Sequence, residues 1–303
     1  MIIPKFFGRV DRNMSQIAKE EITFMTKMKL VIGTRLHLGK ASSPPSQEKT
    51  KSILTNLKKI ADDVASTNQY ETEVLVAVDA TPKLEDYNYV EAVRSAIECC
   101  ESNKDSERLT KFHIIPVMPW GKFVPGLNAL VLHAKAHFEA DLIMFMSAEV
   151  NISSAAVCKL CRNVTENKNV IVAGAAMNGH QYHAGVSDID GNPNRQVVPL
   201  TGRTTPWNTL CVWNLDKLSL TGFSMISDLG QSAGVEECVA IALLQKLFPE
   251  SEARLVKVDG IEWEETFHDE ERKKWHDKKM KSKIERPKIQ LDILGISGVV
   301  THC

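Results

Sequence analysis

The chain has 303 residues, of which 43% are hydrophobic and 25% charged, and its formal net charge at pH 7 is −1. These values are ordinary for a soluble globular protein with a substantial core, and the near-zero charge argues against an overall nucleic-acid or membrane footprint. No apolar run reaches the roughly 18 residues of a membrane span. Seven scattered cysteines and the lack of an N-terminal apolar segment favour a reducing compartment, so we expect a cytoplasmic protein.

Apolar runs that end in polar residues alternate along the chain with segments of helical periodicity. Such alternation is typical of βαβ units and a mostly parallel sheet. The predicted fold class is therefore α/β, with a Rossmann-like, mostly parallel central sheet flanked by helices. We expect strands at 29–35, 73–79, 111–117, 142–146, 169–175, 207–215 and 253–260, and helices at 50–66, 87–100, 127–138, 153–164, 234–248 and 262–286.

The chain shows no internal repeat and no low-complexity linker, which favours one domain. Residues 1–28 are mixed in character and are interpreted as an N-terminal extension, and residues 29–303 as the domain itself. Within it we distinguish residues 29–150, residues 151–261, and a charged C-terminal helix and tail at 262–303. The long polar stretch 178–206 is predicted to be a loop, and a loop of this length is usually functional or disordered.

The segment DLIMFMSAEV, at 141–150, is the most informative stretch of the chain. A buried apolar strand ends there abruptly in Ser147, Ala148 and Glu149. Ligands of open α/β sheets bind outside the carboxyl ends of the strands, so Glu149 is expected at or beside a site. Asp79 ends an earlier strand in the same way. A solvated carboxylate or a helix cap is the plainer interpretation of either residue.

The order of these features resembles the GT-A nucleotide-sugar glycosyltransferases, as a divergent member of the family-two-like group. The segment LNALVLHAKAHFEADLIMFMSAEVNIS resembles the helix and strand that deliver the aspartate-x-aspartate metal motif. LTGF followed by GVEECVAIALL resembles the acceptor-side Gly-Gly-Phe turn and the acidic pair that supplies the catalytic base. The resemblance covers about residues 29–260 and depends more on the order of elements than on identical motifs.

The resemblance implies a sugar transfer from a UDP- or GDP-linked donor to a carbohydrate or other hydroxyl acceptor. Residues 29–150 would be the nucleotide-binding half and 151–261 the acceptor half. Glu237 or Glu236 would be the general base, and Mn²⁺ or Mg²⁺ would neutralise the pyrophosphate. The implied nucleotide-binding residues are Thr34, Arg35, Asp79, Lys122 and Asn128, and the implied acceptor-binding residues are Trp207, Asn208, Gly222 and Phe223.

The metal motif departs from the family pattern, because only Glu149 in Ser147-Ala148-Glu149 is acidic. His268 or His276 could supply a further ligand. Alternatively the metal is weak or absent and basic residues at 273–283 neutralise the pyrophosphate. For the charged segment after residue 262, a solvated helix with i,i+4 ion pairs is the plainer interpretation, and a phosphate-clasping lid is the functional one.

Three further motifs each have a structural and a functional interpretation. Trp207 in TTPWNT has the chemistry to stack on a sugar ring, or it packs a loop down. His180 and His183 in HQYH are interpreted as loop residues rather than metal ligands. Cys158 and Cys161 are either ordinary core-helix cysteines or half of a metal site.

Rival functions belong to other classes. One is a non-catalytic nucleotide- or carbohydrate-binding protein on the same fold, and another is a nucleotidyltransferase. No Gly-rich basic signature follows the first strand, which disfavours the latter. No P-loop, GxSxG or GxGxxG motif follows a strand either. Nucleic-acid binding is not favoured, because acids and bases interleave evenly in the C-terminal segment.

Overall fold

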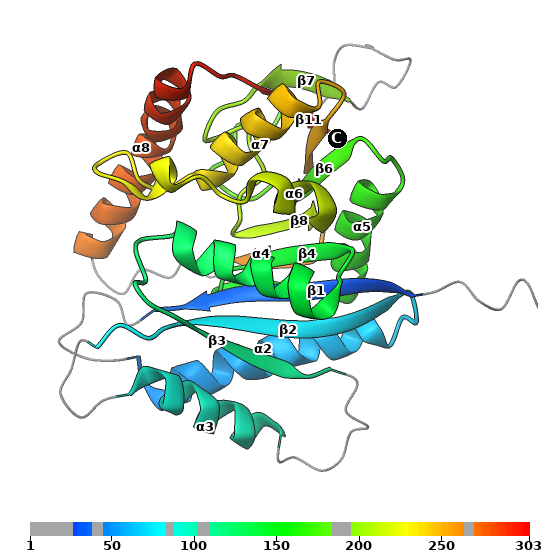
Figure 1. The fold of residues 1–303 in the computed structure, drawn as a ribbon, viewed down its shortest axis with the longest axis vertical. Helices are drawn as coiled ribbons and strands as arrows, with labels where there is room; N and C mark the ends of the chain where they lie inside the picture. The colour runs from blue at the N-terminus through cyan, green and yellow to red at the C-terminus, as the bar shows by residue number, and fades with distance from the viewer. Residues whose placement is uncertain (1–26, 38–44, 83–87, 102–109, 184–194, 264–269) are drawn as a thin grey trace, which may run out of the picture.

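The computed structural model describes residues 27–37, 45–82, 88–101, 110–183, 195–263 and 270–303, with only the backbone described for 270–280. Its centre is a nine-stranded sheet (Figure 1). The strands of this sheet are β1 (Met28–Leu36), β2 (Tyr70–Asp79), β3 (Phe112–Val117), β4 (Leu142–Met146), β6 (Val170–Ala175), β7 (Gln196–Pro199), β8 (Leu210–Asn214), β9 (Glu252–Val256) and β11 (Val299–His302). A separate two-stranded sheet pairs β5 (Val150–Ile152) with β10 (Ile261–Trp263).

The order of the strands in the large sheet is β3-β2-β1-β4-β8-β6-β9-β11-β7. Among the described residues only β8 and β7 run against the others. The strands of the two predicted halves therefore share one continuous sheet. The prediction of an α/β fold with a mostly parallel central sheet is confirmed, and the carboxyl ends of β1, β2 and β4 meet at one edge.

Helices cover both faces of the sheet (Figure 1). One face packs against α2 (Gln47–Ala65), α3 (Tyr89–Glu101) and α5 (Ser154–Thr165). The other packs against α4 (Val124–Phe138), α6 (Leu215–Thr221) and α7 (Glu236–Leu247). Alternating side chains of β1 explain this sandwich, since Leu30 and Ile32 enter the first core and Val31 the second. Cys158 and Cys161 are free and buried in α5, where they belong to the first core.

The C-terminal part of the chain corrects the sequence prediction. Residues 262–286 are not one helix, because β10 occupies Ile261–Trp263 and α8 runs from Glu270 to Leu294. The strand at 253–260 is not the last one, since β11 follows α8. Part of the loop predicted at 178–206 is the strand β7, while 184–194 lies outside the described residues. Helix α6 and strand β5 were also not predicted.

Helix α8 continues past Pro287, the residue that follows the predicted end of the helix at 286. Proline lacks the amide that would bond the carbonyl of Lys283 four residues earlier. Gly202 packs against that same carbonyl, so closely that an added Cβ would collide with it. Pro287 is itself buried against Gly202. The contact with Gly202 thus covers the carbonyl oxygen of Lys283, to which Pro287 has no amide hydrogen to donate.

Two further expectations concern the N-terminal extension and membrane spans. Residues 1–26 of the predicted N-terminal extension lie outside the described residues, and Met28 already belongs to β1. No helix within the described ranges is long and apolar enough to cross a membrane.

Candidate active site

Two adjacent carboxylates, Glu236 and Glu237, occupy the first turn of α7 and are each 4% exposed. A helix N-terminus favours negative charge, which helps to hold two acids there. They line a cavity of about 130 Å³ together with Arg35, Phe123, Ser147, Trp207, Asn208, Thr209, Gly234, Val235, Lys283 and Arg286. The cavity therefore combines two buried acids with three cationic side chains.

Glu237 is the more perturbed of the two acids. Burial, and then the charge of Glu236, raise its pKa from 4.5 to about 8, while Lys283 and Arg286 act in the opposite direction. A carboxylate that accepts a proton near neutral pH is suited to general-base work. The acid pair is therefore the group in this cavity with the clearest capacity to move a proton.

Asn208 orients Glu236. Its side-chain amide donates a hydrogen bond to Oε1 of Glu236 at 3.2 Å, and its carbonyl oxygen accepts one from Nε1 of Trp213 at 3.1 Å. An indole N–H can only donate, so the Asn208 oxygen must face Trp213 and its NH₂ must face Glu236.

Arg35 is the penultimate residue of β1 and brings positive charge to the carboxyl edge of the sheet. Its guanidinium donates to the backbone oxygen of Phe123 at 3.1 Å and lies 5.4 Å from the centre of that ring. Burial lowers the pKa of Arg35, and attraction to the acids around it, Glu236 and Glu237 first and then Asp228 and Glu149, raises it. An arginine held among acids remains a guanidinium cation.

Helix α8 contributes the other two cations. Arg286 donates to the backbone oxygen of Ala233 at 2.9 Å. One turn further, Gln290 donates to the oxygen of Gly234 at 3.0 Å and accepts from the hydroxyl of Ser227 at 2.9 Å. These bonds tie α8 to the loop that precedes the acid pair. Lys283, Arg286 and Gln290 share one face of the helix because they are spaced by three and four residues.

Two of the residues that the resemblance implied for nucleotide binding make contacts within the fold. Thr34 is 2% exposed, and its hydroxyl donates to the backbone oxygen of Met146 at 2.9 Å, which joins β1 to β4. Asn128 is partly buried, accepts from the amide of Phe223 at 2.8 Å and donates to its carbonyl at 2.9 Å. These bonds give both side chains a structural role, and their nucleotide-binding role stays a prediction.

Phe223 and Gly222 also lie away from an open acceptor surface. Phe223 is 2% exposed and packs edge-to-face against Phe145 and Trp213 in the core. Gly222 ends α6 with φ +56°, a left-handed conformation in which an added side chain would meet Asn128. The LTGF turn is therefore a helix end that packs into the core, and its role in acceptor binding stays a prediction.

Trp207 does not offer the open aromatic face that its sequence context suggested. It is 1% exposed, its Nε1 donates to the oxygen of Gly202 at 2.8 Å, and His180 stacks on it with ring centres 3.6 Å apart. Lys283 Nζ lies 2.9 Å from the ring centre. Trp207 thus packs this loop down and positions a cation at the cavity, and it has no free face for a sugar.

The remaining nucleotide-side residues are placed as follows. Asp79 ends β2, is 1% exposed, and accepts from the amide of Thr81 at 3.0 Å. Lys122 is exposed, and its ammonium donates to the oxygen of Gly230 at 2.6 Å. Neither residue lines the acid-pair cavity. Asp79 is not accessible from the surface in this structure.

Asp228 is a buried acid near Arg35 that sequence reasoning did not single out. It accepts from the backbone amides of Lys122, Phe123 and Val124 at 2.9, 2.5 and 2.9 Å, and so caps the start of α4. Arg286 was not singled out either, although the helix predicted at 262–286 already placed it one turn from Lys283.

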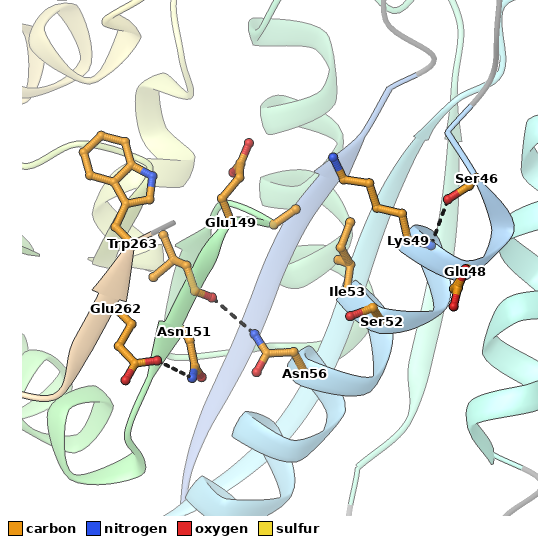
Figure 2. Close-up of a pocket in the computed structure, with 12 residues that line it drawn as sticks. Ser46, Glu48, Lys49, Ser52, Ile53, Asn56, Glu149, Asn151, Glu262 and Trp263 are labelled. Carbon is orange, nitrogen blue, oxygen red and sulfur yellow. Dashed lines mark hydrogen bonds between the residues drawn. The ribbon is translucent and has the colours of Figure 1, made fainter. Parts of the chain in front are cut away.

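Glu149 is exposed and lines a different, larger cavity of about 980 Å³ (Figure 2). Mg²⁺ and Mn²⁺ prefer several oxygen ligands. The described part of the chain contains no cluster of three His, Cys, Asp or Glu side chains able to hold a metal. His268 lies outside the described residues, and for His276 only the backbone in α8 is described. The described donor set does not fit a divalent cation.

Comparisons with known proteins add two similar structures. No family model and no curated protein matches the chain. The mannosyltransferase PcManGT from Pyrobaculum calidifontis, in complex with GDP-Man and Mn²⁺, is 10% identical with a TM-score of 0.46 over 77% of this chain and 59% of that one. The bifunctional glycosyltransferase WbbM, in an apo structure, is 11% identical with a TM-score of 0.33 over 65% and 33%. The chain thus spans well under two thirds of either protein, and likeness at this level does not bear on the roles of individual residues.

Proposed function

We propose that this protein transfers a sugar from a nucleotide-sugar donor to an acceptor hydroxyl. The observation that carries the proposal is the buried Glu236–Glu237 pair beside Arg35, Lys283 and Arg286 at the carboxyl edge of the sheet. Glycosyl transfer needs both a base for the acceptor and positive charge for a diphosphate leaving group. Both kinds of group meet in this one cavity.

The proposed step is a displacement at the anomeric carbon. The acceptor oxygen forms a bond to that carbon as the bond from carbon to the diphosphate oxygen breaks. The ionised Glu237 takes the hydroxyl proton, and the nucleoside diphosphate leaves with the bonding electron pair. Lys283 and Arg286 offset the negative charge that develops on the leaving oxygen, with Arg35 nearby.

The size of the cavity limits what it holds. Pockets for whole small molecules usually measure roughly 300–1,000 Å³, whereas this cavity is about 130 Å³. It therefore suits the reacting groups rather than a complete nucleotide-sugar. We propose that the nucleotide extends from Arg35 along the carboxyl ends of β1 and β2 toward Asp79, which requires a rearrangement at the β2 end, because Asp79 is buried.

The test measures nucleotide binding and turnover separately. Thermal shift with UDP, GDP and their sugar conjugates, each in EDTA and in Mn²⁺, identifies the nucleotide and any metal requirement. Release of nucleoside diphosphate then reports turnover. Glu237→Gln should keep nucleotide binding within about twofold and lower turnover by about 10²–10⁴-fold, the usual contribution of a general base. A response to no nucleotide under either condition would contradict the proposal.

The same variant distinguishes the rival class. A non-catalytic nucleotide-binding protein would bind the nucleotide equally well before and after Glu237→Gln, and neither form would release product. Product release by the wild type that is lost in Glu237→Gln excludes that alternative.

A further inference from the structure

A second cavity, larger than that of the acid pair, lies outside it. It is a groove of about 980 Å³ between the first half of α2 and the small β5–β10 sheet. Figure 2 shows residues of α2 on one side and Glu149, Asn151, Glu262 and Trp263 on the other. The lining residues are Ser46, Glu48, Lys49, Ser52, Ile53, Asn56, Ala148, Glu149, Val150, Asn151, Glu262 and Trp263.

The charge of the groove disfavours a phosphate-bearing ligand. Its lining carries three carboxylates, on Glu48, Glu149 and Glu262, and one ammonium, on Lys49. All four residues are exposed. Excess negative charge around a concave surface repels anions. The cavity of the acid pair has the opposite lining, with three cations. The two cavities are therefore suited to different ligands, an anionic one beside α8 and an uncharged one beside α2.

The remaining groups in the groove have the chemistry that recognises sugars. Trp263 is partly exposed and supplies an apolar ring that can stack on a pyranose face. Asn56 donates to the oxygen of Val150 at 3.3 Å, and Asn151 donates to Oε2 of Glu262 at 3.3 Å (Figure 2). These bonds orient two amides and a carboxylate on the wall of the groove. Amides and carboxylates beside an aromatic ring are suited to bonding hydroxyl groups.

The position of the groove connects it to the proposed chemistry. Ser147 lines the acid-pair cavity, and the next two residues, Ala148 and Glu149, line the groove. On another side, the ring of Trp263 packs edge-on against that of Trp207, with centres 6.2 Å apart. A thin wall of Ser147–Glu149 and this tryptophan pair thus separates the two cavities.

We propose that this groove binds a neutral oligosaccharide, with one sugar ring stacked on Trp263, and that it directs the terminal hydroxyl past Glu149 toward the acid pair. The assignment of that sugar as the acceptor rests on the proposed transferase function. The binding of a carbohydrate in the groove does not depend on it. The proposal also moves the acceptor contact from Trp207, which is buried, to Trp263.

Binding can be measured without turnover by saturation-transfer NMR, with maltotriose, cellobiose and chitotriose as probes. Trp263→Ala removes the stacking ring. Ser52→Arg fills the groove from an exposed position on α2 without touching the core, and Ser95→Arg makes the same exchange at an exposed serine of α3 outside the groove. We expect Trp263→Ala and Ser52→Arg to weaken binding at least about tenfold, as truncating or blocking an aromatic anchor does, and Ser95→Arg to bind like the wild type.

The outcomes separate the two proposals. Binding of no probe to the wild type, or equal binding by Ser52→Arg and the wild type, overturns the groove assignment whatever the nucleotides do. Loss of binding in Ser52→Arg with unchanged UDP or GDP affinity supports it. If an oligosaccharide binds in the groove while no nucleotide binds anywhere, the carbohydrate site stands and the transferase proposal fails.

Discussion

The amide of Asn208 is held between Trp213 and Glu236, and it donates to the carboxylate at 3.2 Å while it accepts from the indole at 3.1 Å. Because the indole fixes which way the amide faces, Glu236 receives a donor that cannot rotate into an acceptor. This contact links Trp213, which lies in the core that packs against α7, to the proposed catalytic pair. It also makes Asn208, predicted to contact the acceptor, a positioning residue for Glu236.

Asn208→Asp should test this contact directly. The variant keeps an acceptor for Trp213 but places a carboxylate where Glu236 now receives a donor. We expect a loss of about 1–3 kcal/mol in the free energy of unfolding at pH 8, the range for a buried group deprived of its partner, and a smaller loss at pH 5, where a carboxyl is more readily protonated. Urea unfolding at the two pH values measures this. An equal loss at both would show that the charge at position 208 is irrelevant.

The pH dependence of turnover should follow the ionisation of Glu237. Its pKa is raised to about 8 by burial and by Glu236, so the base form appears as the pH rises through 8 and the rate rises with it. Glu236→Gln removes one of the two causes, and the rising limb should move to lower pH. A rate profile from pH 5 to pH 9.5 checks the shift. An unmoved limb in Glu236→Gln would assign the ionisation to another group.

The same shift predicts how stability depends on pH. Folding favours the protonated form of Glu237, so the contribution is fully present below pH 4.5 and is lost as the pH rises toward about 8. The loss is at most about 1.4 kcal/mol per pH unit for one group. Glu237→Gln has no such ionisation. We therefore expect the variant to melt at a progressively higher temperature than the wild type as the pH rises from 4.5 to 8, with little further change above 8.

Arg286 should matter for diphosphate affinity. Arg286→Met removes a cation from the cavity while keeping an unbranched side chain against the loop. A lost charged hydrogen bond of about 1.5–3 kcal/mol corresponds to a decrease in affinity for UDP or GDP of roughly 10- to 150-fold. Titration calorimetry with the diphosphate, and with the uncharged nucleoside as control, measures the effect. The nucleoside should be unaffected, and a matching loss for it would indicate a general disturbance of α8.

The contact between Gly202 and α8 gives a prediction for the helix as a whole. An added Cβ at Gly202 would collide with the carbonyl of Lys283, a backbone atom that cannot move alone. We expect Gly202→Ala to displace α8 and to increase its cleavage by trypsin after Lys281 and Lys283, since the bond after Arg286 precedes Pro287 and resists trypsin. Diphosphate affinity should fall with it, because both cations move. Limited proteolysis followed by mass spectrometry locates the cut, and protection equal to that of the wild type would show that α8 accommodates the methyl group.

Local patterns in the sequence were sufficient for the strands β1, β2, β3, β4 and β6 and for most of the helices on them. A buried strand or an amphipathic helix reveals itself through the period of its apolar residues, whatever it packs against. The acids at the start of α7 were found in the same way, because the turn before them and the apolar run after them are local. These local patterns do not show how the strands pair. Strand β8 lies between β4 and β6 and runs antiparallel to both, and nothing in its own residues indicates this direction.

The sequence by itself determined the α/β class, the carboxylates at the ends of its elements, and the single acid in Ser147-Ala148-Glu149. Only the tertiary structure decided that Trp207 is buried and Trp263 partly exposed. It also decided that α8 passes through Pro287 and brings Arg286 over the acid pair. The physical reason is that periodicity records whether a side chain is buried, whereas its partner comes from a segment dozens of residues away. The roles of Asn128, Phe223 and Asn208 depend on contacts with distant segments, so only the tertiary structure could assign them.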